Sequence, residues 1–328
     1  MQQFIDRARQ GRYRVVYAEG AEPRILQAAR RVVDEGIATA VLVGDRADIE
    51  AAALAASVSL DGLESVDPLT SDRREDYTGL YLQGREKAKA GMAARLLRKP
   101  LHFAAMMVKA GDADLVVAGI AHPTRRVIEA AGLCIGFAPG ISLPSSFFLV
   151  SVPGREQPLV FADCALNVAP DAAELAQIAV ASAHSAQCLF GRPPRVALLS
   201  FSTHGSAAHP LVDKVTGALR VARELAPALA IDGDLQADAA LAPAIASAKT
   251  RHESKVAGVA DVLVFPDLNA GNIGYKLVQQ LAGAQAVGPI LQGFARPVAD
   301  LSRGASVDEV VVTTAVALAL SQERESPQ

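Results

Sequence analysis

Hydrophobic and polar positions change their spacing several times along the first part of the chain, and each change predicts an element. Residues 14–17 (RVVY) form a short apolar run that indicates a buried strand. Residues 24–35 carry hydrophobic side chains at helical spacing, and Gly36 marks the end of that helix. A second apolar run follows at 40–44 (AVLVG). Strand, helix and strand in this order predict a parallel α/β sheet.

Further along, the apolar runs and helical segments continue to alternate, with one change of texture. Residues 85–110 read as a helix and residues 114–119 (DLVVAG) as a buried strand. Residues 139–153 and 158–162 then alternate small, polar and aromatic side chains, which predicts antiparallel strands and the entry into a second domain. More strands are expected at 195–200, 229–231 and 262–265, and helices at 171–190, 211–225, after Asn272 and at 307–321.

Length and composition narrow the class of protein. A chain of 328 residues is long for one compact domain, so two domains are expected. Hydrophobic residues make up 51% and Trp is absent, which suits helices packed on a covered sheet. The net charge of −3 and the lack of a Lys/Arg run longer than three residues argue against nucleic acid as a partner.

Cysteine usage and the first residues of the chain predict a cytoplasmic protein with no membrane partner. Three widely spaced cysteines, Cys134, Cys164 and Cys188, form no CxxC pair, so neither a disulfide framework nor a zinc site is predicted. Cys164 is expected to be a small buried hydrophobic residue. The first residues are polar and charged, unlike a signal peptide, and no apolar run approaches the ~20 residues of a membrane span.

The most informative motif is FPDLNAGNIGYKLVQQLAGAQAVGPILQGFARPVADLSRGASVDEVV, residues 265–311. A strand is followed by a Gly/Asn-rich loop, and a helix is expected to open at or near Ile273. Such a turn directs backbone N–H groups and a helix N-terminus at one point, an arrangement that suits phosphate. Taken alone, the same Gly-rich turn is equally consistent with tight packing.

Together with other strings, this motif resembles the phosphate acetyltransferase family. The strings are FADCALN (161–167), ALLSFSTHGSA (197–207), AIDGDLQADAA (230–240) and HFAAMMVKAGDADLVVAG (102–119). The opening VVYAEGAEPRILQAA (15–29) also resembles the family, with Ala18 where Pro is usual. The resemblance runs from about residue 14 to 320.

The resemblance implies a fold of two α/β domains with an interdomain cleft, similar to isocitrate and isopropylmalate dehydrogenases. Residues 1–145 plus 295–328 would form the first domain, and residues 146–294 the second, on the dimerisation side. The family is typically homodimeric.

The resemblance also implies an activity: transfer of an acetyl or short acyl group between coenzyme A and phosphate (acetyl-CoA + phosphate = acetyl phosphate + CoA). Base-assisted attack by the thiol in a ternary complex is expected. Coenzyme A would be a substrate, with no permanently bound cofactor and no metal, and the other partners would be phosphate and acyl phosphate.

Three residues are implied as catalytic. Arg303 lies between Ser302 and Gly304 just before a helix N-terminus, where its planar guanidinium suits a phosphate better than a packing role. Ser302 resembles the family's serine that bonds the reacting group. Glu309 occupies the position of the family's catalytic base, which is usually Asp. Glu309 also fits a capping box with Ser306, and base and cap remain open alternatives.

Eight residues are implied for substrate and coenzyme A binding: Arg85, Thr124, Arg125, Arg126, Ser202, Thr203, Asn272 and Lys276. Four of these residues also have a non-functional alternative. Arg85 would be an exposed charge on a helix, Ser202 and Thr203 would belong to an ordinary turn, and Lys276 would be a solvated lysine. Glu129 stands where the family usually has Arg, so a carboxylate replaces an expected phosphate ligand. Arg125 and Arg126 precede it by four and three residues, share its helix face and are expected to pair with it or to supply the missing cation.

Two other functions compete with an acetyl transferase. The changes at Glu129, Glu309 and Ala305 (usually Cys) are consistent with a different acyl preference or with a catalytically weakened module that senses coenzyme A or acyl phosphate. An oxidoreductase is disfavoured, since no GxGxxG follows the first strand. His122 and His204, the latter in place of an apolar family residue, have no ligand neighbour in sequence, so no metal is predicted.

Overall fold

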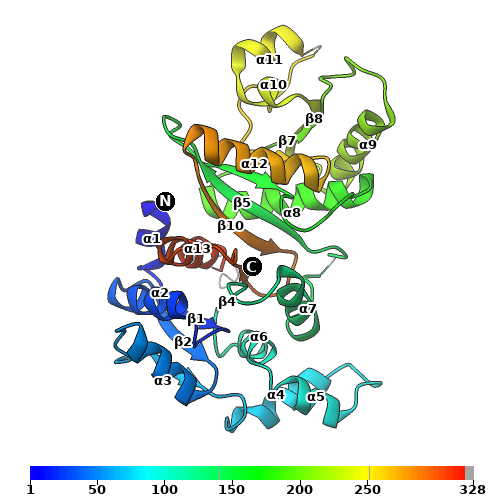
Figure 1. The fold of residues 1–328 in the computed structure, drawn as a ribbon. Helices are drawn as coiled ribbons and strands as arrows, with labels where there is room; N and C mark the ends of the chain where they lie inside the picture. The colour runs from blue at the N-terminus through cyan, green and yellow to red at the C-terminus, as the bar shows by residue number, and fades with distance from the viewer. Residues whose placement is uncertain (140, 251, 322–328) are drawn as a thin grey trace. The chain divides into compact units, whose positions relative to one another are not determined.

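The computed structural model describes residues 1–139, 141–250 and 252–321. The chain divides into two compact units, one of residues 1–139 and 294–328 and the other of residues 140–293 (Figure 1). We call them the first and second units and describe each by itself.

The first unit is built on a parallel sheet with the strand order β3-β2-β1-β4-β11. The strands are β1 (Arg14–Tyr17), β2 (Thr39–Val43), β3 (Glu64–Val66), β4 (Leu115–Ala118) and β11 (Val298–Asp300). The helices are α1 (Gln2–Ala8), α2 (Pro23–Asp34), α3 (Arg46–Ala55), α4 (Arg73–Leu82), α5 (Ala90–Leu96), α6 (Pro100–Ala110), α7 (Thr124–Cys134) and α13 (Val307–Ala319).

Helices cover both faces of this sheet (Figure 1). Helix α13 packs on α1 and α2 and against β4 and β11, while α6 packs against β1, β2 and β4. Strand β1 is fully buried at Val15, Val16 and Tyr17, and the Tyr17 hydroxyl lies 3.1 Å from Thr314 Oγ1 of α13. Burial on both faces is what the continuous apolar run of a parallel strand predicts.

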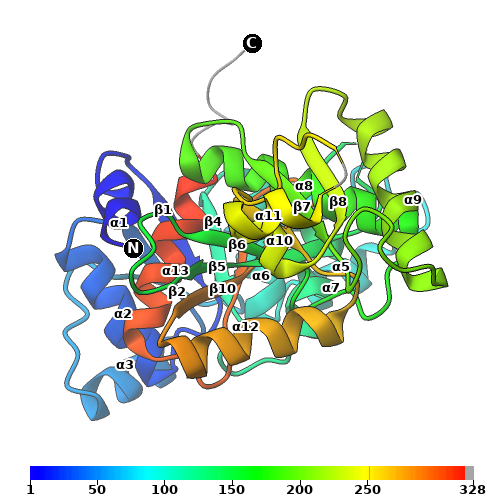
Figure 2. The same cartoon turned by 90° about the horizontal axis from the view of Figure 1, so that it is seen from above.

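The second unit has a mixed sheet with the order β10-β5-β6-β9-β7-β8. The strands are β5 (Ser145–Ser151), β6 (Leu159–Ala162), β7 (Arg195–Leu199), β8 (Ala230–Leu235), β9 (Val262–Val264) and β10 (Gln285–Gln292). Pairs β10–β5 and β5–β6 are antiparallel, and the other pairs are parallel. The helices are α8 (Ala172–Phe190), α9 (Pro210–Leu225), α10 (Ala237–Leu241), α11 (Pro243–Lys249) and α12 (Leu268–Ala282) (Figure 2).

The antiparallel strands allow an aromatic core to form in the second unit. Phe148 of β5 stacks on Tyr275 of α12, with ring centroids 4.2 Å apart, and Phe161 of β6 packs against Phe265 at 5.3 Å. These contacts attach α12 to the sheet and thereby fix the position of the residues that follow along it.

Most sequence-predicted elements are confirmed, but two helices are not as expected. The helix predicted over 85–110 is two helices, because Pro100 begins α6 at its first turn and cannot continue α5. Helix α12 begins at Leu268, not near Ile273: the Asp267 side chain caps it by accepting the Ala270 N–H at 2.9 Å. The Gly/Asn-rich stretch, predicted as a loop, therefore forms the first turns of helix α12, and the turn between strand and helix lies earlier than predicted.

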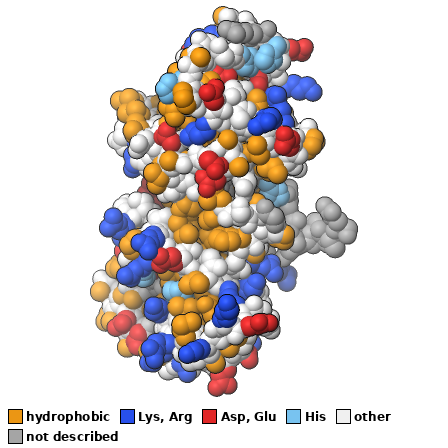
Figure 3. All heavy atoms as spheres, turned by 90° about the vertical axis from the view of Figure 1, so that its right-hand side faces the viewer, with side chains coloured by type: hydrophobic (Ala, Val, Ile, Leu, Met, Phe, Trp, Pro, Cys, Tyr) orange, Lys and Arg blue, Asp and Glu red, His pale blue; other side chains and the backbone are white. Residues whose placement is uncertain are grey.

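Surface charge of both signs is mixed on the face shown in Figure 3, with Lys and Arg side chains close to Asp and Glu. Among the described residues, none of the helices combines the length and the apolar character that crossing a membrane demands.

Candidate functional site

Polar side chains gather in the first unit where β1, β4 and β11 end. These three strands are parallel neighbours, so their carboxyl ends lie at the same edge of the sheet. Glu19 follows β1, residues 119–122 follow β4, and Asp300 to Ala305 close β11 and lead into α13. In open α/β sheets this edge is the usual place for ligands.

Glu19 organises the loop after β4. Its side chain is buried and accepts hydrogen bonds from the backbone N–H groups of Gly119, Ile120 and Ala121 at 3.1, 3.0 and 2.9 Å. His122 Nδ1 lies 2.7 Å from the same carboxylate. A carboxylate with this many donors holds the loop backbone in one conformation.

Asp300 is the most unusual carboxyl group of this edge. It is fully buried, and Thr124 Oγ1 donates to its Oδ2 at 2.5 Å. Its Oδ1 has no hydrogen-bond partner among the residues that the structure describes. Burial raises the pKa of Asp300 to about 7, the Thr124 hydrogen bond acts in the opposite direction, and the Glu19 charge adds to the rise.

Gly119 makes room for Asp300. A Cβ on Gly119 would lie 2.2 Å from Asp300 Oδ1 and 2.7 Å from the Leu301 nitrogen, and the residue has a φ of +112°. Both the space and the backbone conformation therefore require glycine here.

Arg24 of α2 holds the turn from Ser302 to Ala305 by hydrogen bonds to its backbone oxygens. Arg24 Nη1 donates to the backbone oxygens of Arg303 at 2.9 Å and Ala305 at 3.0 Å, and its Nε pairs with Glu22 Oε1 at 2.8 Å. The Ser302 hydroxyl accepts from the Gly304 N–H at 3.3 Å. Because Arg24 fixes the backbone, the exposed Arg303 side chain is displayed on a defined turn.

Arg303 meets the requirements for an anion ligand. No carboxylate within the described parts of the chain lies within 4.0 Å of its guanidinium, whereas eight other arginines of this unit have such a partner. It also immediately precedes the N-terminus of α13, whose free N–H groups favour negative charge.

Glu309 forms the capping box that its spacing allows. The Ser306 N–H donates to Glu309 Oε2 at 2.7 Å, and the Glu309 N–H donates to Ser306 Oγ at 3.2 Å. Of the two alternatives, the cap is therefore present in the structure. The neighbouring Asp308 points elsewhere and pairs with Arg31.

Arg125 and Glu129 form the ion pair expected on α7, with Arg125 Nε 2.9 Å from Glu129 Oε1 and both side chains largely exposed. Arg126 is exposed and, in the part of the chain that the structure describes, has no ion-pair partner within 4.0 Å. The cation left over on this face is thus Arg126.

Arg85 lies in the segment between α4 and α5. It follows α4 instead of lying on a helix, so an exposed helix charge is wrong. Its Nη1 donates to the Tyr81 oxygen at 2.5 Å, its Nη2 donates to the Leu133 oxygen at 2.6 Å, and it lies over the Tyr81 ring. These carbonyls belong to the last turns of α4 and α7, so Arg85 joins two helix C-termini.

Ser202 and Thr203 belong to the second unit and are buried in the loop after β7. Ser202 Oγ accepts from the Ala207 N–H at 3.2 Å, and Thr203 Oγ1 accepts from the Gln236 N–H at 3.0 Å. Both hydroxyls therefore stabilise the loop in which they lie.

Asn272 and Lys276 lie on α12. The Asn272 amide donates to the Cys164 oxygen at 3.0 Å, while Lys276 is exposed, with its ammonium 5.2 Å from the Tyr275 ring centroid. The sequence predicts Lys276 at the start of this helix. That prediction is wrong, because α12 begins at Leu268. Cys164 is buried, and burial raises the pKa of its thiol.

Four residues of this edge escaped prediction from sequence: Glu19, Arg24, Gly119 and Asp300. The signal that does exist is positional, because each lies in a polar or glycine-containing string directly after or at the end of an apolar run. Their partners lie far away in sequence, 100 residues from Glu19 to Gly119 and 279 from Arg24 to Arg303, and no local pattern reveals such pairs.

Comparison with known proteins places these features in context. The family model described as phosphate acetyl/butaryl transferase matches residues 1–318. The phosphate acetyltransferase of Thermoanaerobacterium thermosaccharolyticum is 47% identical over 325 residues, which cover 96% of this chain and 98% of that protein. A crystal structure of a phosphotransacetylase from Streptococcus pyogenes superimposes with a TM-score of 0.91 at 36% identity, covering 98% of this chain and 99% of that one.

A more distant likeness concerns the fold alone. 4-Hydroxythreonine-4-phosphate dehydrogenase from Klebsiella pneumoniae matches with a TM-score of 0.57 at 12% identity, over 95% of this chain and 100% of that one. The expected dehydrogenase-like α/β fold is thereby confirmed.

Proposed function

Since this chain belongs to the phosphate acetyl/butaryl transferase family, we propose that it transfers an acetyl group between coenzyme A and phosphate. The observation that carries the proposal within the structure is the exposed Arg303, which has no carboxylate partner among the described residues and lies on a turn held by Arg24. A cation displayed in this way before a helix N-terminus suits a phosphate or acyl phosphate.

The reaction proceeds by attack of the coenzyme A sulfur on the carbonyl carbon of acetyl phosphate in a ternary complex. The S–C bond forms as the thiol proton leaves to a base, and the C–O bond to phosphate then breaks. Phosphate departs with the bonding pair, and the reverse sequence makes acetyl phosphate. The chain has to hold the phosphate charge, stabilise the tetrahedral oxyanion and accept the thiol proton.

Arg303 and Ser302 serve the first two needs. The guanidinium fork holds two phosphate oxygens, which a lysine at the same place would hold only as a point charge. The Ser302 hydroxyl, oriented by the Gly304 N–H, donates to the reacting group. We expect Arg303→Ala to raise the KM for phosphate and lower kcat, while Arg46→Ala, an exposed arginine of α3, leaves both unchanged.

Glu309 is proposed as the base that takes the thiol proton. A free thiol has a pKa of about 8.5 and is mostly protonated at neutral pH. The Ser306 N–H fixes the direction of the Glu309 carboxylate, so capping and proton transfer use the same orientation. The extra methylene relative to Asp shifts that carboxylate, and a displacement of about 1 Å costs up to ~100-fold in rate.

Glu309→Gln separates the two roles of this residue. Glutamine keeps the capping box but accepts no proton. If Glu309 is the base, kcat falls by about 100-fold or more with an unchanged melting temperature. If it is only a cap, kcat stays within twofold. Ser306→Ala is the matched variant, since it weakens the cap by about 1 kcal/mol and leaves the carboxylate in place.

Arg126 is proposed as the cation that replaces the arginine lost at position 129. Arg125 pairs with Glu129, whereas Arg126 has no carboxylate partner in the described parts of the chain. Arg126→Ala is therefore expected to raise the KM for phosphate several-fold, and Arg125→Ala, its neighbour on the same helix, to change it less. Equal effects of the two variants contradict this assignment.

The remaining predicted binding residues are proposed for coenzyme A and for positioning. Lys276 is exposed and free to contact phosphates of coenzyme A, as a solvent-facing lysine does in other anion sites. The other predicted residues have polar groups that already bond within the protein, so they act by fixing loops and helix ends. They are Ser202, Thr203, Asn272, Thr124 and Arg85.

The overall proposal is tested by thiol release from acetyl-, propionyl- and butyryl-CoA with and without phosphate. We expect phosphate-dependent turnover that is fastest with acetyl-CoA. If turnover is fastest with propionyl- or butyryl-CoA, the enzyme prefers a longer acyl group, and the reaction class is still acyl transfer to phosphate. Measurable coenzyme A binding without turnover, by calorimetry on the same preparation, favours a sensing module and overturns the proposal.

A further inference from the structure

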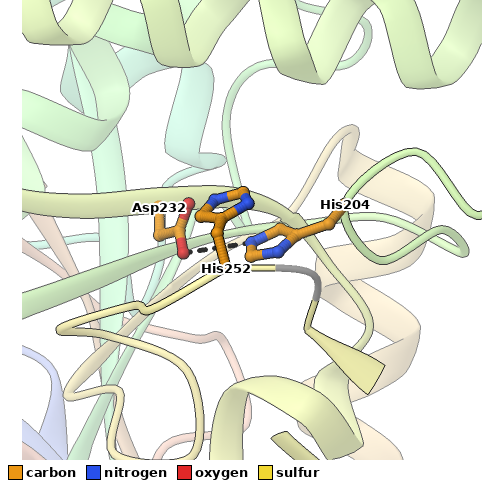
Figure 4. Close-up of side chains that lie close together, drawn as sticks. All are labelled: His204, Asp232 and His252. Carbon is orange, nitrogen blue, oxygen red and sulfur yellow. Dashed lines mark hydrogen bonds and ion pairs between the residues drawn. The ribbon is translucent and has the colours of Figure 1, made fainter. Parts of the chain in front are cut away.

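Three metal-ligating side chains converge in the second unit, apart from the residues assigned to acyl transfer. His204 comes from the loop after β7, Asp232 from β8 and His252 from the segment after α11 (Figure 4). One potential ligand atom of each residue lies within 4.8 Å of those of the other two. Sequence spacing predicts no metal site here, because the three residues come from three separate elements.

The spacing of His204 and Asp232 fits a metal of the size of Zn²⁺. His204 Nε2 lies 3.2 Å from Asp232 Oδ2. Metal bonds of about 2.0 Å at a tetrahedral angle place neighbouring ligand atoms about 3.3 Å apart. The His252 ring stacks on His204 with a centroid distance of 4.0 Å and an interplanar angle of 1°. Because His252 is exposed, a change of its side-chain torsions brings its nitrogen to the same point without moving the core.

Two of the three ligands are already held in place. The side chains of His204 and Asp232 are 2% and 7% exposed. His204 has a φ of +47°, an uncommon conformation outside glycine, and its N–H donates to the Asp234 oxygen at 2.9 Å. A strained backbone that aims a buried imidazole at a carboxylate is typical of sites with a function.

Asp232 also has the supporting contacts of a metal ligand. Its Oδ1 accepts from the Gly233 N–H at 2.9 Å, and Ser254 Oγ donates to Oδ2. Arg223 is the nearest cation, with Nη2 3.7 Å from Oδ1, the oxygen that does not face His204. Such outer contacts orient a carboxylate toward its ion.

Space for a further ligand lies beside the cluster. A cavity of about 250 Å³ is lined by Asp232, His252 and Ser254, among other residues. A metal held by two imidazoles and one carboxylate would thus keep a fourth position for water or a small ligand.

We propose that His204, Asp232 and His252 bind one divalent cation of borderline softness, with Zn²⁺ as the reference ion. Two imidazoles and a carboxylate favour Zn²⁺ over Mg²⁺ or Ca²⁺, which prefer all-oxygen sites. The ion ties the segment after α11 to the loop after β7, in which Ser202 and Thr203 precede His204. Its role is to fix this loop, not to take part in acyl transfer.

Calorimetric titration of the chelator-treated full chain with Zn²⁺ tests the proposal. We expect one site per chain, and a loss of affinity of at least tenfold in His252→Asn. His209→Asn is the matched control: His209 is an exposed histidine of the same unit, and its ring caps α9, a role that Asn also fills. The control and Arg303→Ala are expected to bind Zn²⁺ like the parent protein.

A spectroscopic arm keeps the result independent of stability. Co²⁺ in place of Zn²⁺ is expected to give the visible absorption of a four-coordinate ion in the parent and in His209→Asn, and to lose it in His252→Asn and Asp232→Asn. Equal Zn²⁺ binding by the parent and His252→Asn, or no stoichiometric binding by a parent protein that unfolds cooperatively, overturns the proposal. The cluster is then a hydrogen-bonded Asp–His pair with a stacked imidazole.

Discussion

Asp300 couples the stability of the first unit to pH, and Asp300→Asn should remove that coupling. In an unfolded chain an aspartate has a pKa of about 3.9, whereas burial raises that of Asp300 to about 7 in the folded protein. Between these values the folded state binds a proton that the unfolded state does not. The stabilisation from this group is therefore fully present below about pH 4 and is lost as the pH rises through about 7.

The magnitude follows from the size of the pKa shift. A single proton of difference changes the free energy of unfolding by about 1.4 kcal/mol per pH unit. Between about pH 5 and pH 8, the parent should lose roughly 2 to 3 kcal/mol relative to Asp300→Asn. Asparagine stays neutral throughout and retains an oxygen for the Thr124 hydroxyl, so the comparison isolates the ionisation.

Urea unfolding at several pH values measures this difference directly. The quantity to compare is the free energy of unfolding of the parent minus that of Asp300→Asn at each pH. Asp308→Asn is the control, since it removes a carboxylate of the same segment whose side chain is 77% exposed. A parent-minus-variant difference that is flat from pH 5 to 8 would refute the reasoning, and a rise with pH would reverse its sign.

Two further changes probe the same edge of the sheet. Gly119→Ala is expected to lower the free energy of unfolding by roughly 3 kcal/mol or more, because a Cβ would meet Asp300 Oδ1 at 2.2 Å and the φ is unfavourable. Gly136→Ala is the control, since Gly136 also has a positive φ but faces open space. In the same denaturant titration it should lower the free energy of unfolding by only about 1 kcal/mol. Arg24→Lys is expected to raise the KM for phosphate several-fold with little change in melting temperature, because one ammonium cannot bond the Arg303 and Ala305 carbonyls and Glu22 in the same geometry; an unchanged KM would show that the turn holds its shape without Arg24.

The elements that sequence predicts well are those whose pattern is local. The runs predicted at 14–17 and 195–200 are strands over 14–17 and 195–199, because burial on both faces demands a continuous apolar run. The sequence predicts the start of helix α12 too late, because the first turns of this helix contain Gly271. That glycine serves close packing, since a Cβ there would lie 2.4 Å from the Asp163 oxygen. Glycine read as a turn signal and glycine required by close approach look alike in sequence.

In the candidate site, too, the contacts between residues close in sequence are predictable and the contacts between distant segments are not. The capping box of Ser306 and Glu309 and the pair of Arg125 and Glu129 lie within one helical turn, so their spacing predicts them. The contacts of Arg24 and Asp300 join segments that only the sheet order brings together. The raised pKa of Asp300 arises from its burial, and the sequence composition does not reveal which carboxyl group is buried.

The two carboxylates that depart from the family pattern, Glu129 and Glu309, are each accommodated by a neighbour in the same helix. Glu129 is paired with Arg125, whereas Arg126 has no ion-pair partner among the residues that the structure describes. Glu309 uses one oxygen for the Ser306 N–H, a bond that directs its carboxylate. Under the proposed roles, the phosphate would be held by cations at different positions, and the proton would travel to a carboxylate about one bond farther from the backbone. A strong effect of Arg126→Ala on the KM for phosphate, together with an effect of Glu309→Gln confined to kcat, is the pattern that this argument requires.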